Sequence, residues 1–203
     1  MNRFVSIFMV ISFALLILAC TGSDEKTEQV SNDSFEFRKT RWGMTMEEVK
    51  SSEDISPSKE KDNNIVYKEQ FNSIPSTVGY IFVDGKLVKA AYLFNERNQN
   101  PDDYIVTYER IKGLLINDYG PPTLDEVKWI DEDKTDSTDD LGKSVCEGEV
   151  SYKSEWIVEN TFIELVLDGV SSRCRQGVIF QSKEHYNLEQ NKVKSLQPDV
   201  KVE

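Results

Sequence analysis

The sequence predicts an α+β fold in which two short helix-plus-strand units form one antiparallel sheet with helices on one face. A capping box predicts a short first helix, and an apolar repeat at helical spacing predicts a longer second one. Alternating stretches joined by tight-turn residues predict strands after each helix. Sequential hairpins favour antiparallel pairing, and two helices cover only one face of such a sheet. The other face is expected to meet solvent or a partner.

Residues 1–19 have the composition of an export signal. Arg3 is followed by an uncharged, largely apolar run over residues 4–19. This run is shorter than the roughly 20 residues that a membrane-spanning helix needs. The chain then reaches Cys20, which makes the segment a candidate for cleavage near that residue. The alternatives are an uncleaved anchor helix and an ordinary signal followed by an incidental cysteine.

The ending Ile17-Leu18-Ala19-Cys20 resembles the signal of bacterial lipoproteins. In that family the cysteine thiol receives a diacylglycerol, the signal is cut before the cysteine, and the new amino group is acylated. The resemblance implies that Cys20 is the lipidation site and that the protein contacts the membrane through this lipid anchor. Because Thr21 rather than aspartate follows, it also implies the outer membrane if the source is Gram-negative.

Composition divides the rest of the chain into a tether, a domain and a tail. Residues 20–34 are polar and cannot bury enough apolar surface to fold, so they are predicted to form a disordered tether. Residues 35–185 have the length of a single domain, whose element order suggests two α-β-β-β units. Residues 186–203 form a polar C-terminal tail.

The charge balance argues against a nucleic-acid partner. The chain carries 24 lysine and arginine residues against 36 aspartate and glutamate residues, for a formal net charge of −12. Such a chain is repelled by phosphate backbones. We therefore expect no nucleic acid among its partners.

The first unit begins with a helix whose two ends are both signalled. Thr45 and Glu48 have the spacing of a capping box, so the helix is expected to begin there and to end by about Asp54, before Pro57. Asp84-Gly85 is a strong hairpin signal, because both residues tolerate positive φ. The strands expected in this unit cover 65–71, 77–83 and 86–94.

The second unit repeats this order. Asp102-Asp103 is predicted to cap a helix over 104–119, and Gly120 is predicted to end it. Asp168-Gly169 is expected to mark the last hairpin. The strands expected here cover 127–130, 149–158, 161–167 and 173–182.

Two motifs add a resemblance at the level of the fold. Trp42-Gly43-Met44-Thr45 before the first helix and Tyr119-Gly120-Pro121-Pro122 after the second are similar to segments of SmpA/BamE-like lipoproteins and of the β-lactamase-inhibitor-like fold. Those families pack helices on an antiparallel sheet. They present a surface to another protein and perform no chemistry, so the resemblance implies a non-enzymatic binding module.

No combination of residues in the sequence indicates catalysis. His185 is the only histidine, and we expect it on the surface, without a nucleophile motif beside it. The sequence contains no glycine-rich phosphate loop, so no cofactor is expected and the protein is not predicted to be an enzyme. Cys146 and Cys174 form an even pair in an exported chain, which favours a disulfide; two buried free thiols are the alternative.

The acidic loop 131–140 is the one candidate metal site. Asp131, Asp133 and Asp136 place carboxylates at spacings that suit calcium. The loop departs from the calcium-binding loop pattern, since Asp136 stands where that pattern has glycine and Gly142 where it has glutamate. A solvated loop is the alternative. Trp129 adjoins the loop and is a candidate ligand contact, whereas Trp42 and Trp156 are expected in the core.

These observations lead to two functional hypotheses. The first is a lipid-anchored protein of the cell envelope that binds another protein through the free face of its sheet and performs no reaction. The alternative is an envelope module that binds a small ligand or calcium through the acidic loop 131–140, with Trp129 beside it.

Overall fold

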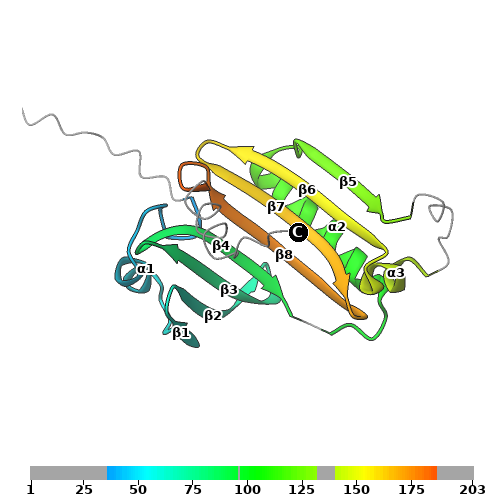
Figure 1. Cartoon of the computed structure of the whole chain (residues 1–203), viewed down its shortest axis with the longest axis horizontal. Helices are drawn as coiled ribbons and strands as arrows, with labels where there is room; N and C mark the ends of the chain where they lie inside the picture. The colour runs from blue at the N-terminus through cyan, green and yellow to red at the C-terminus, as the bar shows by residue number, and fades with distance from the viewer. Residues whose placement is uncertain (1–35, 96, 132–139, 187–203) are drawn as a thin grey trace, which may run out of the picture. The chain divides into compact units, whose positions relative to one another are not determined.

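The computed structural model of the chain describes residues 36–95, 97–131 and 140–186. These residues form an antiparallel sheet and three helices (Figure 1). The predicted signal (1–19), the tether (20–34) and the C-terminal tail, apart from Tyr186, lie outside the described residues. In chain order the elements are α1 (Met46–Ser52), β1 (Lys59–Lys61), β2 (Asn64–Phe71), β3 (Ile74–Val83), β4 (Lys86–Phe94), α2 (Asp102–Tyr119), β5 (Leu124–Trp129), α3 (Leu141–Glu147), β6 (Val150–Val158), β7 (Thr161–Val170) and β8 (Arg173–Ser182).

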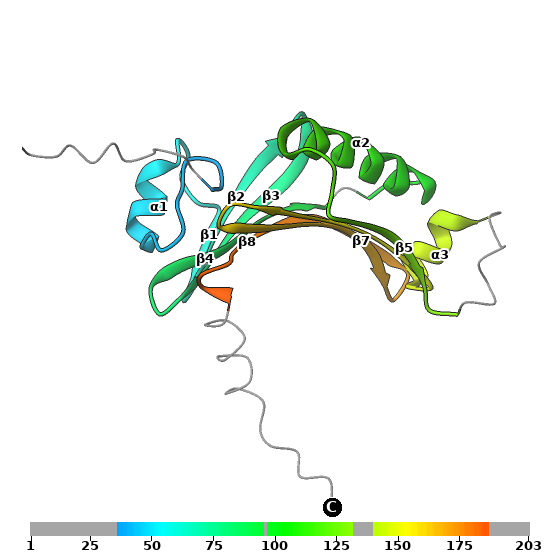
Figure 2. The same cartoon turned by 90° about the horizontal axis from the view of Figure 1, so that it is seen from above.

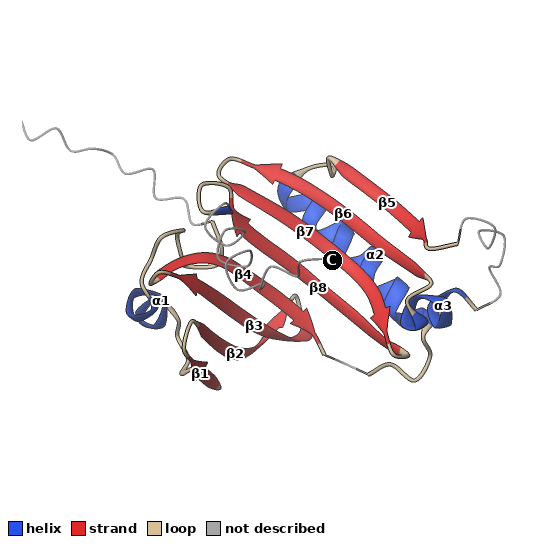
Figure 3. Ribbon diagram, viewed as in Figure 1, coloured by secondary structure: helices blue, strands red, loops and turns tan. Residues whose placement is uncertain are grey.

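The predicted balance of helix and strand in an α+β fold is wrong, because the sheet dominates (Figure 3). Strand accounts for 47% of the structure and helix for 23%. The sequence does not predict β1, because its three exposed residues carry no alternating pattern. It does not predict α3 either, because this helix of seven residues is too short to show an apolar period.

Two four-stranded meanders join at their last strands to make the sheet. The strand order is β1-β2-β3-β4-β8-β7-β6-β5, and every pairing is antiparallel. The pairing of β4 with β8 runs from Lys89 opposite Gln181 to Phe94 opposite Gln176. Each meander follows a helix, and α3 is inserted between β5 and β6 of the second one. The described residues thus form two units whose final strands meet in the middle of the sheet.

The hairpin turns rely on residues held at positive φ. Asp84 and Gly85 have φ of 51° and 76°, as a two-residue turn between β3 and β4 requires. The predicted turn at Asp168-Gly169 is wrong, because both residues lie inside β7. The chain reverses instead at Ser171 and Ser172, with φ of 53° and 58°. Gly169 is required at its position because the backbone of α3 packs directly against it and leaves no room for a side chain.

All three helices lie on one face of the sheet. α2 packs on β6, β7 and β8, and α3 packs beside it on β7 and β8 (Figure 2). The residue that follows α1, Glu53, accepts a hydrogen bond from Tyr80 of β3, whose side chain points to the same face. No helix formed by the described residues lies on the opposite face, which we call the uncovered face.

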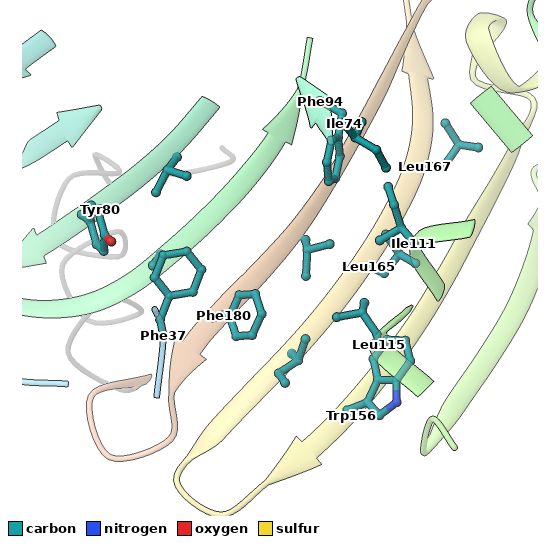
Figure 4. Close-up of a cluster of buried hydrophobic side chains, with 14 of the residues drawn as sticks. Phe37, Ile74, Tyr80, Phe94, Ile111, Leu115, Trp156, Leu165, Leu167 and Phe180 are labelled. Carbon is teal, nitrogen blue, oxygen red and sulfur yellow. The ribbon is translucent and has the colours of Figure 1, made fainter. Parts of the chain in front are cut away.

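A single hydrophobic core runs beneath the helices through both units. One row of buried residues crosses five strands in register, from β3 through β4, β8 and β7 to β6. Figure 4 shows how this core continues from one unit to the other. Burial of each large side chain contributes about 1.5–3 kcal/mol to the stability of the fold, so the row that the units share stabilises their association. The row consists of Tyr80, Ala90, Phe180, Ile163 and Trp156.

A buried ion pair fastens the N-terminal segment to the first unit. The Arg38 guanidinium donates to both carboxylate oxygens of Glu53, at 3.0 and 2.8 Å. The Glu53 side chain is only 2% exposed, and it also accepts a hydrogen bond from the Tyr80 hydroxyl. Burial and this hydrogen bond raise the pKa of Tyr80 well above its usual value. Removing one partner would leave an uncompensated buried charge, so the group holds the end of α1 on β3.

Some of the helix ends are capped by the residues that the sequence predicts, and others are not. Thr45 and Glu48 form the predicted capping box of α1. At the end of α2, the N–H of Gly120 donates to the carbonyl of Ile116 at 2.9 Å. Asp102, however, does not cap α2, which begins two residues earlier than predicted and has Pro101 at its N-cap. The Asp102 carboxylate instead accepts the N–H of Gly142 at 2.9 Å, in the first turn of α3.

Close backbone contacts hold α3 on the sheet. A Cβ atom added at Gly169 of β7 would lie 2.0 Å from the carbonyl oxygen of Val145 and 2.3 Å from that of Cys146. A Cβ atom at Gly142 would lie 2.4 Å from the backbone of Pro101. A disulfide between Cys146 and Cys174 joins the helix to β8. The seven residues of α3 are therefore fixed by the sheet and by the start of α2.

These contacts predict the effect of two matched substitutions. Gly169→Ala should lower the free energy of unfolding by about 1–3 kcal/mol, because the new methyl group overlaps two carbonyl oxygens of α3. Gly79→Ala, in β3, is the control, because its Cβ atom would meet nothing within 4 Å. It should change stability by less than about 0.5 kcal/mol. Urea unfolding of the oxidised proteins measures both. Equal losses in the two variants would contradict the packing described for α3.

Candidate functional site

The uncovered face carries exposed apolar residues in three of its central strands. Strand alternation turns one set of residues toward the core and the other set toward this face. On it, the side chains of Leu93 in β4, Ile157 in β6 and Phe162 in β7 are 44%, 55% and 36% exposed. Phe162 lies directly opposite Ile157 in the pairing of β6 with β7. Half-buried Ile179 of β8 and Val166 of β7 extend the apolar area between them.

Small residues lower the surface where the two units meet. Gly79 of β3 pairs with Ala91 of β4, and Leu93 of β4 pairs with Gly177 of β8. All four residues belong to the set that points to the uncovered face. Only Leu93 among them has a large side chain, so the middle of this face is low while Leu93 stands above it.

A hollow of about 510 Å³ lies beside this low region. Tyr186, the last described residue, forms part of its lining and packs its ring against Phe162 with the centroids 5.9 Å apart. Lys183 adds a cation over the same Phe162 ring, 5.5 Å from the centroid. The floor and walls are formed mainly by Lys89, Lys153, Glu155, Ile157, Phe162, Glu164, Ile179 and Gln181.

Several charges on the uncovered face neutralise one another. Lys153 of β6 forms ion pairs with Glu155, at 2.5 Å, and with Glu164, at 3.0 Å. The hydrogen bonds to Glu155 and then to Glu164 raise the pKa of Lys153. At the end of the same face, Arg175 donates two hydrogen bonds to Asp168, at 2.8 and 2.6 Å. These pairs leave the apolar residues between them as the part of the face available for contact.

The disulfide lies away from the uncovered face. The Cys146 and Cys174 sulfur atoms are 2.06 Å apart and join α3 to the start of β8. Cys174 lies two residues before Gln176 in the strand, on the helix-covered side. The pair therefore supports α3 and does not contribute to the hollow.

The other predicted site residues fall in different places. Cys20 lies outside the described residues, as do Asp133 and Asp136. Asp131 is exposed at the end of the described segment. Among the described residues, no three histidine, cysteine, aspartate or glutamate side chains are grouped as a metal site would need. The calcium prediction for the loop 131–140 stays a prediction.

The expectation that His185 lies on the surface is wrong. It is buried, its Nδ1 is 3.0 Å from the Ser182 hydroxyl, and its ring lies against Gly43. The turn that holds Gly43 is fixed from outside, because Trp42 Nε1 donates to Thr161 Oγ1 at 2.9 Å. This contact joins residues 119 positions apart in the chain. A tertiary contact of that range gives no local signal, so the histidine looked exposed in the sequence.

The tryptophans pack into the structure. Trp156 is fully buried and its Nε1 donates to the carbonyl of Gly120 at 2.8 Å. Trp42 and Trp129 pack against the core as partly buried residues. Trp129 therefore lies against the core, whereas residues 132–139 of the acidic loop that was predicted to use it lie outside the described residues.

The sequence predicts a free sheet face but does not identify the residues that form it. Residues that point away from the core in these strands are usually polar. Three of them are apolar instead, namely Leu93, Ile157 and Phe162, and this departure was the only sign of the surface in the sequence. They could be recognised only once the strands were in register, because no two of them belong to the same strand.

Comparison with known proteins adds no assignment. No protein-family model, no curated protein and no solved structure matches the chain. Among the described helices, none is long and apolar enough to cross a membrane.

Proposed function

We propose that this chain is a lipid-anchored protein of the cell envelope that binds another protein through the uncovered face and catalyses no reaction. One observation carries the binding role. An eight-stranded sheet buries one face under helices and presents Leu93, Ile157 and Phe162 on the other. Exposed apolar residues gathered on a rigid sheet are typical of an interaction surface.

The chemistry of this face defines the partner that would fit. Lys153, Glu155 and Glu164 already compensate one another, so a strongly charged partner would have to break existing ion pairs. An apolar or aromatic patch on a folded protein would instead fill the hollow beside Phe162 and bury Ile157. We therefore propose a folded envelope protein that presents an apolar patch, with a largely neutral centre, to this face.

The anchor is proposed from the sequence motif at Cys20. Cleavage before this residue and acylation of its thiol and amino group would attach the chain to the membrane. Acyl chains contribute about 0.8 kcal/mol per buried methylene, so several chains would make the attachment effectively permanent. In a cell with two membranes, Thr21 favours the outer one. Residues 20–34 would then separate the domain from the bilayer.

The anchor predicts a specific labelling result. In cells fed a palmitate analogue, the wild-type chain should become labelled. Cys20→Ala should not become labelled and should retain the uncleaved signal peptide. Thr21→Ala is the matched control, because it changes a neighbouring residue without removing the thiol. It should label as well as the wild type. Equal labelling of Cys20→Ala and wild type would contradict lipidation at Cys20.

The binding surface predicts a position-dependent crosslink. A photoreactive amino acid at Ile157, on the uncovered face, should give one discrete adduct in intact cells. The control places it at Val106 of α2, which is 67% exposed and lies on the helix side of the sheet. No such adduct should form there. An adduct of the same size from both positions, or none from Ile157, would contradict binding through the uncovered face.

A further inference from the structure

A second and larger cavity opens where β8 extends past the end of β4. The pairing of these strands stops at Phe94 opposite Gln176, while β8 begins at Arg173 and pairs there only with β7. The chain that leaves β4 and the helix α3 border the resulting space of about 880 Å³. That volume is in the range of small-molecule sites. Among the residues that the structure describes, none lines both this cavity and the hollow on the uncovered face.

The lining of this cavity has a charge opposite to that of the chain. Arg97 follows β4, Lys143 belongs to α3, and Arg173 and Arg175 belong to β8. Glu147 is the one acidic residue among the described residues of the lining, and these residues together carry a net charge of +3. The whole chain has a formal net charge of −12. Four cations from three separate segments thus converge on one space in a strongly acidic protein.

Two of these cations are available for a ligand. Among the described residues, neither Arg97 nor Arg173 has an ion-pair partner. Lys143 lies 4.0 Å from Glu147, which is a weak pair between partly exposed side chains. Arg175 donates side-on to Asp168 through two hydrogen bonds, the geometry in which arginine recognises carboxylates.

The remaining walls are apolar and fixed in place. Leu93, Phe94 and Pro101 contribute apolar surface, and the disulfide of Cys146 and Cys174 forms part of the lining. This disulfide ties α3, and with it Lys143, to the strand that carries Arg173 and Arg175. A site held by a covalent bond and close backbone contacts requires little reordering on binding.

We propose that this cavity binds a small organic anion that carries two or more carboxylates on a compact apolar body. Arg97 and Arg173 each engage one carboxylate, Lys143 adds charge, and the apolar walls contact the body of the ligand. This inference goes beyond the proposed protein-binding function. Leu93 belongs both to the exposed apolar residues of the uncovered face and to the cavity lining, whereas Ile157 and Phe162 lie outside the cavity. The crosslink from Ile157 tests the protein-binding role and the titration below tests the cavity, so the failure of one can be told from the failure of the other.

Calorimetric titration of the full chain in detergent with citrate tests the proposal. Citrate should bind at one site per chain and more tightly than inorganic phosphate. The double variant R97Q/R173Q should bind citrate at least about tenfold more weakly than the wild type, because each of the two substitutions removes a charge-assisted contact with the ligand. The double variant K59Q/K61Q removes the same charge from β1 at the sheet edge, and it should bind citrate like the wild type.

Three results would overturn the proposal. Absence of citrate binding by the folded wild type would remove the site. Equal weakening in both double variants would show attraction by overall charge rather than by the cavity. Phosphate binding as tight as citrate binding would show an oxyanion site without the proposed carboxylate preference. Thermal unfolding of each variant, compared with the wild type, verifies that a lost affinity is not a lost fold.

Discussion

Antiparallel pairing of β4 with β8 turns two four-stranded meanders into one sheet, and the other features of the molecule depend on this junction. Without it each unit would expose the edge of a hydrophobic strand, a state that invites aggregation. The core also crosses it, because Phe37 packs against Tyr80 and Tyr92 of the first unit and Phe180 of the second. The helices and the uncovered face therefore lie on opposite sides of one continuous sheet and do not belong to two separate units.

Glycine residues have different structural roles on the two faces of the sheet. On the helix side, Gly169 and Gly142 allow backbone to approach backbone, which fixes α3 in a position that its own seven residues could not maintain. On the uncovered side, Gly79 and Gly177 leave the surface low between larger side chains. One face is thus packed for rigidity and the other is left open. This division is what a scaffold for binding needs, because a fixed surface loses little entropy on association.

Features determined by neighbouring residues could be predicted from the sequence. The capping box of Thr45 and Glu48 and the turn at Asp84-Gly85 depend on contacts within a few residues, and both are present. Asp102 and His185 were misjudged, because their partners lie far along the chain or in a turn held by a distant contact. β1 was missed for the same reason, since it acquires strand structure from its pairing with β2 rather than from its own pattern. Likewise, the cavity near the disulfide gathers residues from three segments that no local motif connects.

Native-state hydrogen exchange measures directly whether the sheet is one cooperative unit. If the junction of β4 and β8 unites the molecule, the central amides of β3 and β7 should exchange only through global unfolding, with the same free energy of opening. That free energy should equal the value obtained from urea unfolding. A central amide of β3 that opens at a free energy several kcal/mol below one in β7 would show two independently unfolding units and would contradict this account.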